Sequence, residues 1–186
     1  MSGKELNQKV YKWARSKLGQ KVDSGECWDL AHRALQHAGA QSSTTTGKND
    51  DYVWGDPVTV QAVVPGDILQ LRDHVVTTTV TTDVTFEDGS GYEDTKESSF
   101  KRSHHTAIVA ENKGAFGLVV LEQNVDPGGK KVQQNALPLT GSGPSVKTEF
   151  RSMKDSTGKL RRAKVVVTTT TTVSGRISAY RPRAKP

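Results

Sequence analysis

The sequence predicts an α+β fold, because helical patterns fill the first forty residues and strand patterns fill most of the rest. A first amphipathic helix, ending near Gly19, is indicated by apolar residues at three- and four-residue steps: Leu6, Val10, Trp13, Ala14 and Leu18. A second helix begins at Cys27 and ends near Gly39. Helices that precede the strands, instead of alternating with them, are typical of the α+β class.

The predicted strands follow in order after a polar loop at 42–51 and a short strand or turn at 52–55. Pro65, Gly66 and Asp67 form a strong turn signal just before the first of them. The strand-like segments are 68–71, 105–110, 118–123, 132–139 and 177–180. The segments 105–110 and 118–123 are expected to pair through the loop that contains Gly114 and Gly117.

Two threonine- and valine-rich segments, 75–82 and 166–173, resemble each other. Their β-branched residues favour extended structure, so we expect them to be two arms of a polar β-ribbon, with 87–99 as a flexible loop at one end. A low-complexity insertion is the alternative. The chain is thus expected to be one domain over 1–186, with an insertion at about 75–102 and a basic segment at 151–186.

Composition narrows the class of protein. The chain has 186 residues, of which 33% are hydrophobic, so it can bury a modest core. No apolar stretch approaches the roughly 20 residues that span a bilayer, and the N-terminus has no apolar signal region. These features favour a cytoplasmic protein, or one exported by a route that the sequence does not show. The single cysteine excludes an internal disulfide framework and a multi-cysteine zinc site, so neither metal nor cofactor is expected.

The charge is unevenly placed along the chain. Residues 151–186 contain ten Lys or Arg and one acid, Asp155, so their net charge is +9. The whole chain has a net charge of +6, so the other 150 residues have a net charge of −3. A basic segment of this kind suits an anionic surface, and a solvated strand pair with a frayed terminus is the alternative. Because the aromatic interleaving of nucleic-acid-binding segments is missing, no specific nucleic-acid partner is predicted.

Cys27 is the residue that points to chemistry. At the start of a helix, unpaired backbone N–H groups and the helix dipole favour the thiolate. His105 opens an apolar strand and can serve as a base, while Glu122 and Asn124 lie two residues apart and are expected to share one strand face. If the two strands pair, either polar group reaches the imidazole. Together these residues form a cysteine-nucleophile constellation.

Other interpretations of the same residues stay open. A lone cysteine on an apolar helix face also fits core packing, and one cysteine without paired ligand spacing argues against a metal site. Successive strand residues point to opposite faces, so only one of His104 and His105 can face the cysteine. We expect His105 to do so, and Gln70 or another polar side chain to add a hydrogen-bond donor.

The order of these motifs resembles the CHAP and NlpC-type cysteine peptidases, which have a papain-like α+β fold. The resemblance covers roughly residues 5–137 without 75–102 and is carried by Cys27, Pro65-Gly66-Asp67-Ile68, His105 to Val109, and Glu122-Gln123-Asn124. It implies N-terminal helices packed on an antiparallel sheet or half-barrel. It also implies Cys27 as nucleophile, His105 as base, Glu122 next to the histidine and Asn124 as support.

A second resemblance covers nearly the whole chain. The segment from Gly25 to Ala31, together with 52–55, 66–70, 104–109, 122–124 and 180–182, is similar to the cysteine-proteinase-fold domain at the C-terminus of some fungal actin-patch proteins. In such domains the protease-like fold need not carry protease activity.

Two functions follow as expectations. The first is a cysteine amidase or peptidase that cleaves an amide bond in a peptide or peptidoglycan-like substrate through a thioester acyl-enzyme. The second is a non-catalytic interaction module with the papain-like fold. It binds a protein partner in the cleft that corresponds to the substrate cleft of the peptidases. A third idea is an anionic-polymer binder that uses residues 151–186.

Overall fold

The computed structural model describes residues 3–44 and 51–186, and part of the loop expected at 42–51 lies outside these residues. The described chain forms two compact units. Unit 1 comprises the described residues of 1–75 together with 101–139 and 174–186, and unit 2 comprises 76–100 and 140–173. The predicted insertion at 75–102 therefore overlaps the first segment of unit 2, and the basic segment 151–186 is divided between the units.

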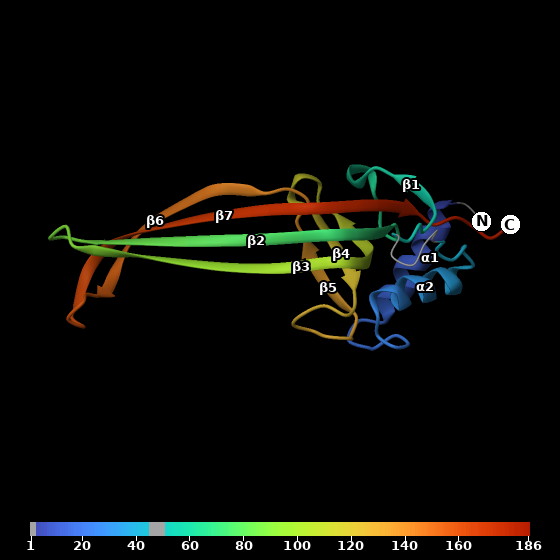
Figure 1. Ribbon diagram of the computed structural model, residues 1–186, viewed down its shortest axis with the longest axis horizontal. Helices are drawn as coiled ribbons and strands as arrows, with labels where there is room; N and C mark the ends of the chain where they lie inside the picture. Colours follow the sequence, from blue (N-terminus) through green and yellow to red (C-terminus); the bar gives the residue numbers. More distant parts are fainter. Residues whose placement is uncertain (1–2, 45–50) are drawn as a thin grey trace. The chain divides into compact units, whose positions relative to one another are not determined.

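The helices agree with the sequence pattern. They are α1 (Gly3–Ser16) and α2 (Cys27–Ala38). Gly39 caps the end of α2 with a left-handed φ of 76°, which glycine adopts without a side-chain clash. Figure 1 shows α1 and α2 side by side in unit 1. Leu6, Val10 and Leu30 lie in one buried cluster with Trp54 and Ile108, so the helices share their core with the sheet.

The strands form one sheet with the order β1-β7-β2-β3-β4-β5, and β6 pairs with β7. Their bounds are β1 (Asp56–Val58), β2 (Ile68–Phe86), β3 (Gly91–Asn112), β4 (Leu118–Glu122), β5 (Gln133–Leu137), β6 (Ser142–Lys154) and β7 (Leu160–Arg181). Two short 3-10 helices, Val60–Ala62 and Gly114–Phe116, complete the described elements. The α+β class with N-terminal helices and an antiparallel sheet is thus confirmed.

The pairing expected between 105–110 and 118–123 is present, with Ile108 opposite Leu121 and Asn112 opposite Leu118. The predicted flexible loop at 87–99 is wrong, because only a short turn separates β2 from β3 and residues from Gly91 onward are strand. Their polar composition suggested a loop, whereas a neighbouring strand holds them in place.

Both threonine-rich segments lie in strands, one in β2 and one in β7. The two strands are neighbours in the sheet, and the hydroxyls of Thr78 and Thr171 are 3.3 Å apart. The expected pairing of the two arms is therefore present, and their status as an insertion stays a prediction.

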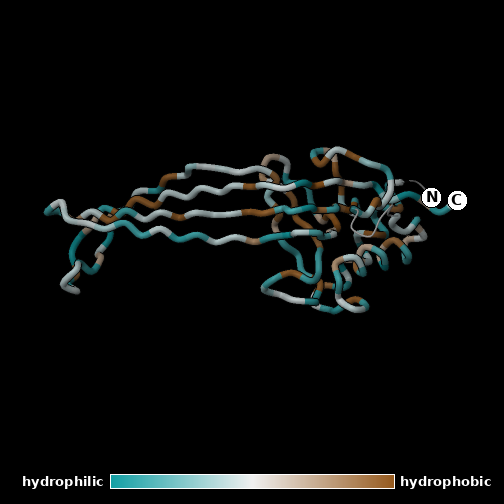
Figure 2. Tube along the Cα trace, viewed as in Figure 1, coloured by the Kyte–Doolittle hydropathy of each residue, from teal (hydrophilic) through white to brown (hydrophobic). Residues whose placement is uncertain are grey.

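Unit 2 buries little apolar surface. Its cluster of buried residues consists of Val84, Phe86, Ala163 and Val165, with Met153 and Val167 packed against them. Figure 2 shows most of the trace of these strands in hydrophilic or neutral colours, with short hydrophobic stretches. By contrast, unit 1 carries the large buried core and all the residues predicted to form the site.

Candidate active site

Cys27 is the first residue of α2, and the residues before it fix the start of that helix. The Asp29 carboxylate accepts hydrogen bonds from the Glu26 backbone N–H (3.0 Å) and the Ser24 hydroxyl (2.6 Å). Gly25 has a φ of 88°, and a Cβ there would lie 2.6 Å from the Cβ of Lys130. The glycine is therefore required by both backbone conformation and space.

Gln123, which the sequence analysis gave no role, ties the same loop to the end of β4. Its fully buried amide accepts a hydrogen bond from Val22 N–H (3.2 Å) and donates to the carbonyl oxygens of Val22 (3.2 Å) and Glu26 (2.6 Å). The residue before Cys27 is thus held by the residue after Glu122. This contact sets the position of the sulfur relative to the sheet.

The Cys27 thiol is partly buried, and the side chain of His105 interacts with it. Burial raises the pKa of the thiol, but the hydrogen bond and charge of His105 and the backbone N–H groups of Thr106 and Trp28 outweigh it. The pKa of Cys27 therefore lies below its ordinary value. This favours a thiolate at the start of α2.

His105 lies on β3 between the sulfur and a carboxylate. Its Nε2 is 2.8 Å from Oε2 of Glu122, at the end of β4, so Nε2 carries a proton and Nδ1 remains for Cys27. Burial lowers the pKa of His105, but the hydrogen bonds and charges of Cys27 and Glu122 outweigh it and raise that pKa above its ordinary value. The two shifts together favour a thiolate–imidazolium pair.

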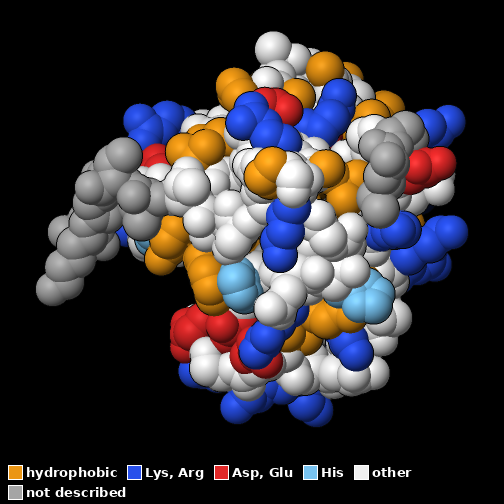
Figure 3. Space-filling view, turned by 90° about the vertical axis from the view of Figure 1, so that its right-hand side faces the viewer, with side chains coloured by type: hydrophobic (Ala, Val, Ile, Leu, Met, Phe, Trp, Pro, Cys, Tyr) orange, Lys and Arg blue, Asp and Glu red, His pale blue; other side chains and the backbone are white. Residues whose placement is uncertain are grey.

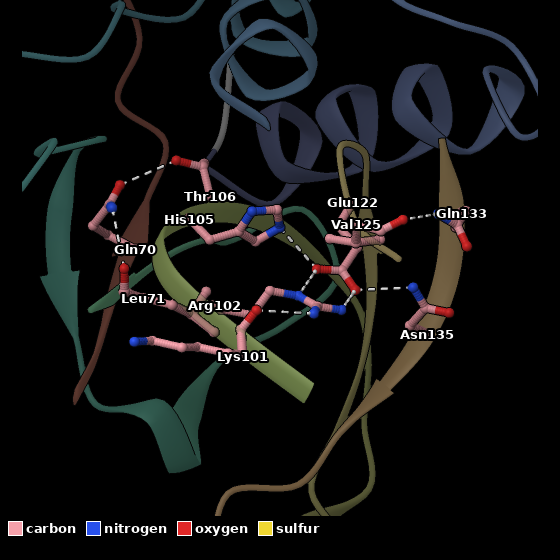
Figure 4. A network of polar contacts seen from close by, with 10 residues as sticks. All are labelled: Gln70, Leu71, Lys101, Arg102, His105, Thr106, Glu122, Val125, Gln133 and Asn135. Carbon is pink, nitrogen blue, oxygen red and sulfur yellow. Dashed lines mark hydrogen bonds and ion pairs between the residues drawn. The ribbon is translucent and has the colours of Figure 1, made fainter. Parts of the chain in front are cut away.

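Glu122 is the centre of a buried polar network (Figure 4). Arg102 donates to both carboxylate oxygens, from Nε at 3.0 Å and from Nη2 at 2.8 Å, and Asn135 on β5 donates to Oε1 at 2.9 Å. Burial raises the pKa of Glu122, whereas His105 and Arg102 lower it, to about 2. Glu122 is therefore a carboxylate at any physiological pH.

Charge balance in this group follows from Arg102. With the thiolate–imidazolium pair formed, Cys27 and Glu122 carry two negative charges, and His105 and Arg102 carry two positive ones. Burying an unpaired charge is costly, and the balanced set avoids that cost. Arg102 and Asn135 were not among the predicted site residues. Arg102 lies three residues before His105 on β3, so strand alternation alone puts the two side chains on opposite faces and does not predict that both contact Glu122.

The expected position of Asn124 is wrong. β4 ends at Glu122, and Asn124 has a left-handed φ of 63°, so these two residues do not share a strand face. The Asn124 amide instead donates to Glu26 at 2.7 Å, and Lys130 donates to the other carboxylate oxygen of Glu26 at 2.7 Å. Asn124 thus supports the residue that precedes Cys27, and a direct contact with the His105 ring is not part of the structure.

The two neighbouring histidines point to different surroundings, as expected from strand alternation. His105 contacts Cys27 and Glu122, whereas Nε2 of His104 is 3.6 Å from Asp51 and its ring lies 5.4 Å from that of Tyr52. The carbonyl oxygen of Gln70 accepts hydrogen bonds from Trp54 (3.3 Å) and Thr106 (3.1 Å), and its amide nitrogen donates to the Leu71 carbonyl oxygen at 3.5 Å. Figure 4 shows Gln70 directed toward Thr106, away from Glu122.

Five of the ten basic residues of the segment 151–186 form ion pairs with acids. Arg176 binds Asp51 at 2.6 Å and Arg181 binds Asp67 at 2.8 Å, both in unit 1, and Arg161 binds Asp88 at 2.7 Å in unit 2. Figure 3 shows Lys and Arg side chains scattered over the visible face among neutral and hydrophobic ones. An anionic partner for this segment stays a prediction.

Within residues 3–44 and 51–186, His, Cys, Asp and Glu side chains do not gather in groups of three or more that could hold a metal ion. None of the helices in this part of the chain has the length and apolar character needed to cross a bilayer.

Comparison with known proteins places the chain in a family. The model of the AIM3/BBC1 cysteine proteinase-fold domain matches residues 2–141. The chain is also 28% identical, over 131 residues, to "Altered inheritance of mitochondria protein 3" of Debaryomyces hansenii; the match covers 63% of this chain and 13% of that relative. No solved structure matches. With three quarters of its length matched by the family model, the chain belongs to the AIM3/BBC1 cysteine proteinase-fold domain family.

Proposed function

We propose that Cys27 is the nucleophile of a cysteine amidase or peptidase. The observation that carries this proposal is the arrangement of Cys27, His105 and Glu122: Nε2 of His105 lies 2.8 Å from Glu122, and the interaction of His105 with Cys27 lowers the thiol pKa and raises the imidazole pKa. A cysteine buried only for packing has its pKa raised by burial. The opposite direction here is the condition that nucleophilic catalysis requires.

The reaction follows from the positions of the groups. The thiolate adds to the carbonyl carbon of the amide, and backbone N–H groups at the start of α2 stabilise the oxyanion. The His105 imidazolium gives its proton to the leaving amine as the C–N bond breaks, which leaves a thioester on Cys27. Water, deprotonated by His105, then cleaves the thioester and regenerates the thiol. Glu122 holds the ring throughout through Nε2.

The proposed substrate is a peptide or a peptidoglycan-like amide. This choice rests on the resemblance of the motifs to CHAP and NlpC-type enzymes. The sole cysteine makes the first half-reaction simple to follow, because any thioester must be on Cys27.

An acylation experiment tests this function. The chain is mixed with an activated ester of an N-acyl amino acid, and the acyl-enzyme is measured by mass spectrometry for the wild type and the variants Cys27→Ser, His105→Ala and His104→Ala. We expect acylation in the wild type and in His104→Ala, none in Cys27→Ser, and a rate at least about a hundredfold lower in His105→Ala, since general-base catalysis contributes that much. Equal rates in the two histidine variants would contradict the proposal.

A second function is favoured by the family. The family is described by its fold, and the match covers 13% of the length of the relative, which is a much longer protein. A protein-interaction domain that keeps the papain-like fold fits that setting. In that case Cys27 acylates no faster than a free cysteine, and Cys27→Ser binds its protein partner as the wild type does.

A further inference from the structure

Four partly exposed rings form a row at the candidate active site: His32, Trp28, Tyr52 and His104. The first two rings, both on α2, stack with their centroids 4.1 Å apart. The Tyr52 ring lies 6.5 Å from that of Trp28 and 5.4 Å from that of His104 on β3. The row therefore includes the residue that follows Cys27 and the residue that precedes His105. All of these residues belong to unit 1.

A buried tryptophan fixes this aromatic row relative to β3. Trp54 is 1% exposed, and its ring lies 6.3 Å from that of Trp28 and 5.7 Å from that of Tyr52. Its Nε1 donates a hydrogen bond to the carbonyl oxygen of Gln70 at 3.3 Å. The Thr106 hydroxyl donates to the same oxygen at 3.1 Å (Figure 4). Because Thr106 is the residue after the proposed base, these bonds hold the aromatic row close to the site.

The surroundings of the aromatic row favour a neutral aromatic ligand. Nε1 of Trp28 already donates to the Ser43 hydroxyl at 3.0 Å, so this ring presents its apolar face. Asp51, at one end of the row, binds Arg72 at 2.7 Å and Arg176 at 2.6 Å. A cationic ligand would have to compete with these two guanidinium groups for the carboxylate. A neutral aromatic side chain instead gains offset or edge-to-face contacts with the partly exposed rings.

The aromatic row borders the acyl part of a bound substrate. The leaving amine must lie at the His105 imidazole, because that group protonates it. Successive side chains of a strand point to opposite faces, and His104 and His105 have different surroundings in the structure. The His104 end of the row is therefore turned away from the leaving amine. The part of the substrate on the carbonyl side of the cleaved bond lies beside the rings.

We propose that the aromatic row binds the aromatic side chain of the substrate residue whose carbonyl carbon Cys27 attacks. This inference rests on the proposed function and narrows its substrate to peptides with Phe, Tyr or Trp at that residue. Tyr52 is the central ring, since it lies between Trp28 and His104 and also packs near Trp54. The preference for an aromatic residue therefore depends most on Tyr52.

Acylation by two activated esters tests this preference. The esters of N-acetyl-phenylalanine and N-acetyl-alanine are compared by mass spectrometry, and each rate is divided by the rate of the same ester with free cysteine. The wild type should react about tenfold faster with the phenylalanine ester. Tyr52→Ala should reduce that ratio to about threefold or less, because the central ring is lost. Since each ratio is taken within one protein, a change in the folded fraction cancels.

Tyr92→Ala is the matched control, because it removes an exposed tyrosine of unit 2. It should keep the wild-type ratio of the two rates. A Tyr52→Ala protein with the wild-type ratio, or a wild type that reacts equally with both esters, would overturn the aromatic site. Either result would leave Cys27 as the nucleophile.

A binding measurement on Cys27→Ser separates the aromatic site from catalysis. The indole N–H signals of the three tryptophans are followed by NMR while N-acetyl-phenylalanine amide is added. The Trp28 signal, assigned with Trp28→Phe, should shift, and the signal of Trp13 on α1 should not. A Trp28 shift in a chain that neither ester acylates would support the aromatic site and contradict the catalytic proposal. A Trp28 signal that does not move would overturn the aromatic site.

Discussion

Glu122 is the residue on which the chemistry of the site depends. It receives hydrogen bonds from His105, Arg102 and Asn135, and so it both orients the imidazole and shares its charge with a guanidinium. A carboxylate in this position stabilises an imidazolium, whereas a neutral amide would fix only the tautomer. Arg102 offsets the charge of Glu122, so its influence on His105 is weaker than that of an unpaired carboxylate.

Replacing Glu122 separates these roles. Glu122→Gln should lower the pKa of His105, because the hydrogen bond and charge that raise it are weakened, and should slow alkylation of Cys27 near neutral pH. Asn124→Ala should leave the His105 pKa nearly unchanged, because Asn124 contacts Glu26 and not the ring. An NMR titration measures the pKa of His105 in both variants. A larger pKa shift in the Asn124 variant would assign the orienting role to the amide.

At the scale of elements, the site depends on how α2 begins. Gln123 joins the loop before α2 to the end of β4 with three hydrogen bonds to backbone groups. Gln123→Ala should lower the free energy of unfolding by about 2–4 kcal/mol, since it leaves buried backbone groups unpaired. It should also slow Cys27 alkylation, because the sulfur is no longer held against His105.

Urea unfolding and alkylation rates check this expectation, with Gln134→Ala on exposed β5 as control. The control should change the unfolding free energy by no more than about 0.5 kcal/mol. If Gln123→Ala and Gln134→Ala have the same unfolding free energy and the same alkylation rate, the hydrogen bonds of Gln123 between β4 and the loop before α2 do not hold Cys27 in position.

The elements also show what the sequence could and could not predict. Apolar periodicity located α2 and the pairing of β3 with β4, because tertiary burial requires that pattern. Asn124 was misplaced because the strand ends at Glu122, two residues before it. Asn124 begins a turn, with a left-handed φ of 63° that Asn tolerates, and its N–H bonds the carbonyl oxygen of Gly129 at 2.9 Å. β6 was missed because its side chains are exposed and its polar sequence has no periodic apolar face.

At the scale of the whole molecule, the buried charges make stability depend on pH. The folded-state pKa of Glu122, about 2, lies below its ordinary 4.5. Its contribution is therefore complete above the ordinary pKa and is lost as the pH falls through the folded-state value. That contribution is on the order of 3 kcal/mol.

Comparing the wild type with Glu122→Gln isolates this effect. Their difference in unfolding free energy should be largest near neutral pH and should shrink as the pH falls from about 5 toward 2. Denaturant titrations at several pH values measure it. A difference that is constant over this range would mean that Glu122 is not held as a buried carboxylate.

The central claim is that Cys27 is paired with His105 as a thiolate, and the ultraviolet absorbance of the thiolate tests it most directly. The absorbance is titrated with pH, and the curve of Cys27→Ser is subtracted to remove other groups. We predict a midpoint below the ordinary thiol value of about 8.5, and an upward shift of that midpoint in His105→Ala. A wild-type midpoint at or above the ordinary value, or the same midpoint in both proteins, would contradict the account.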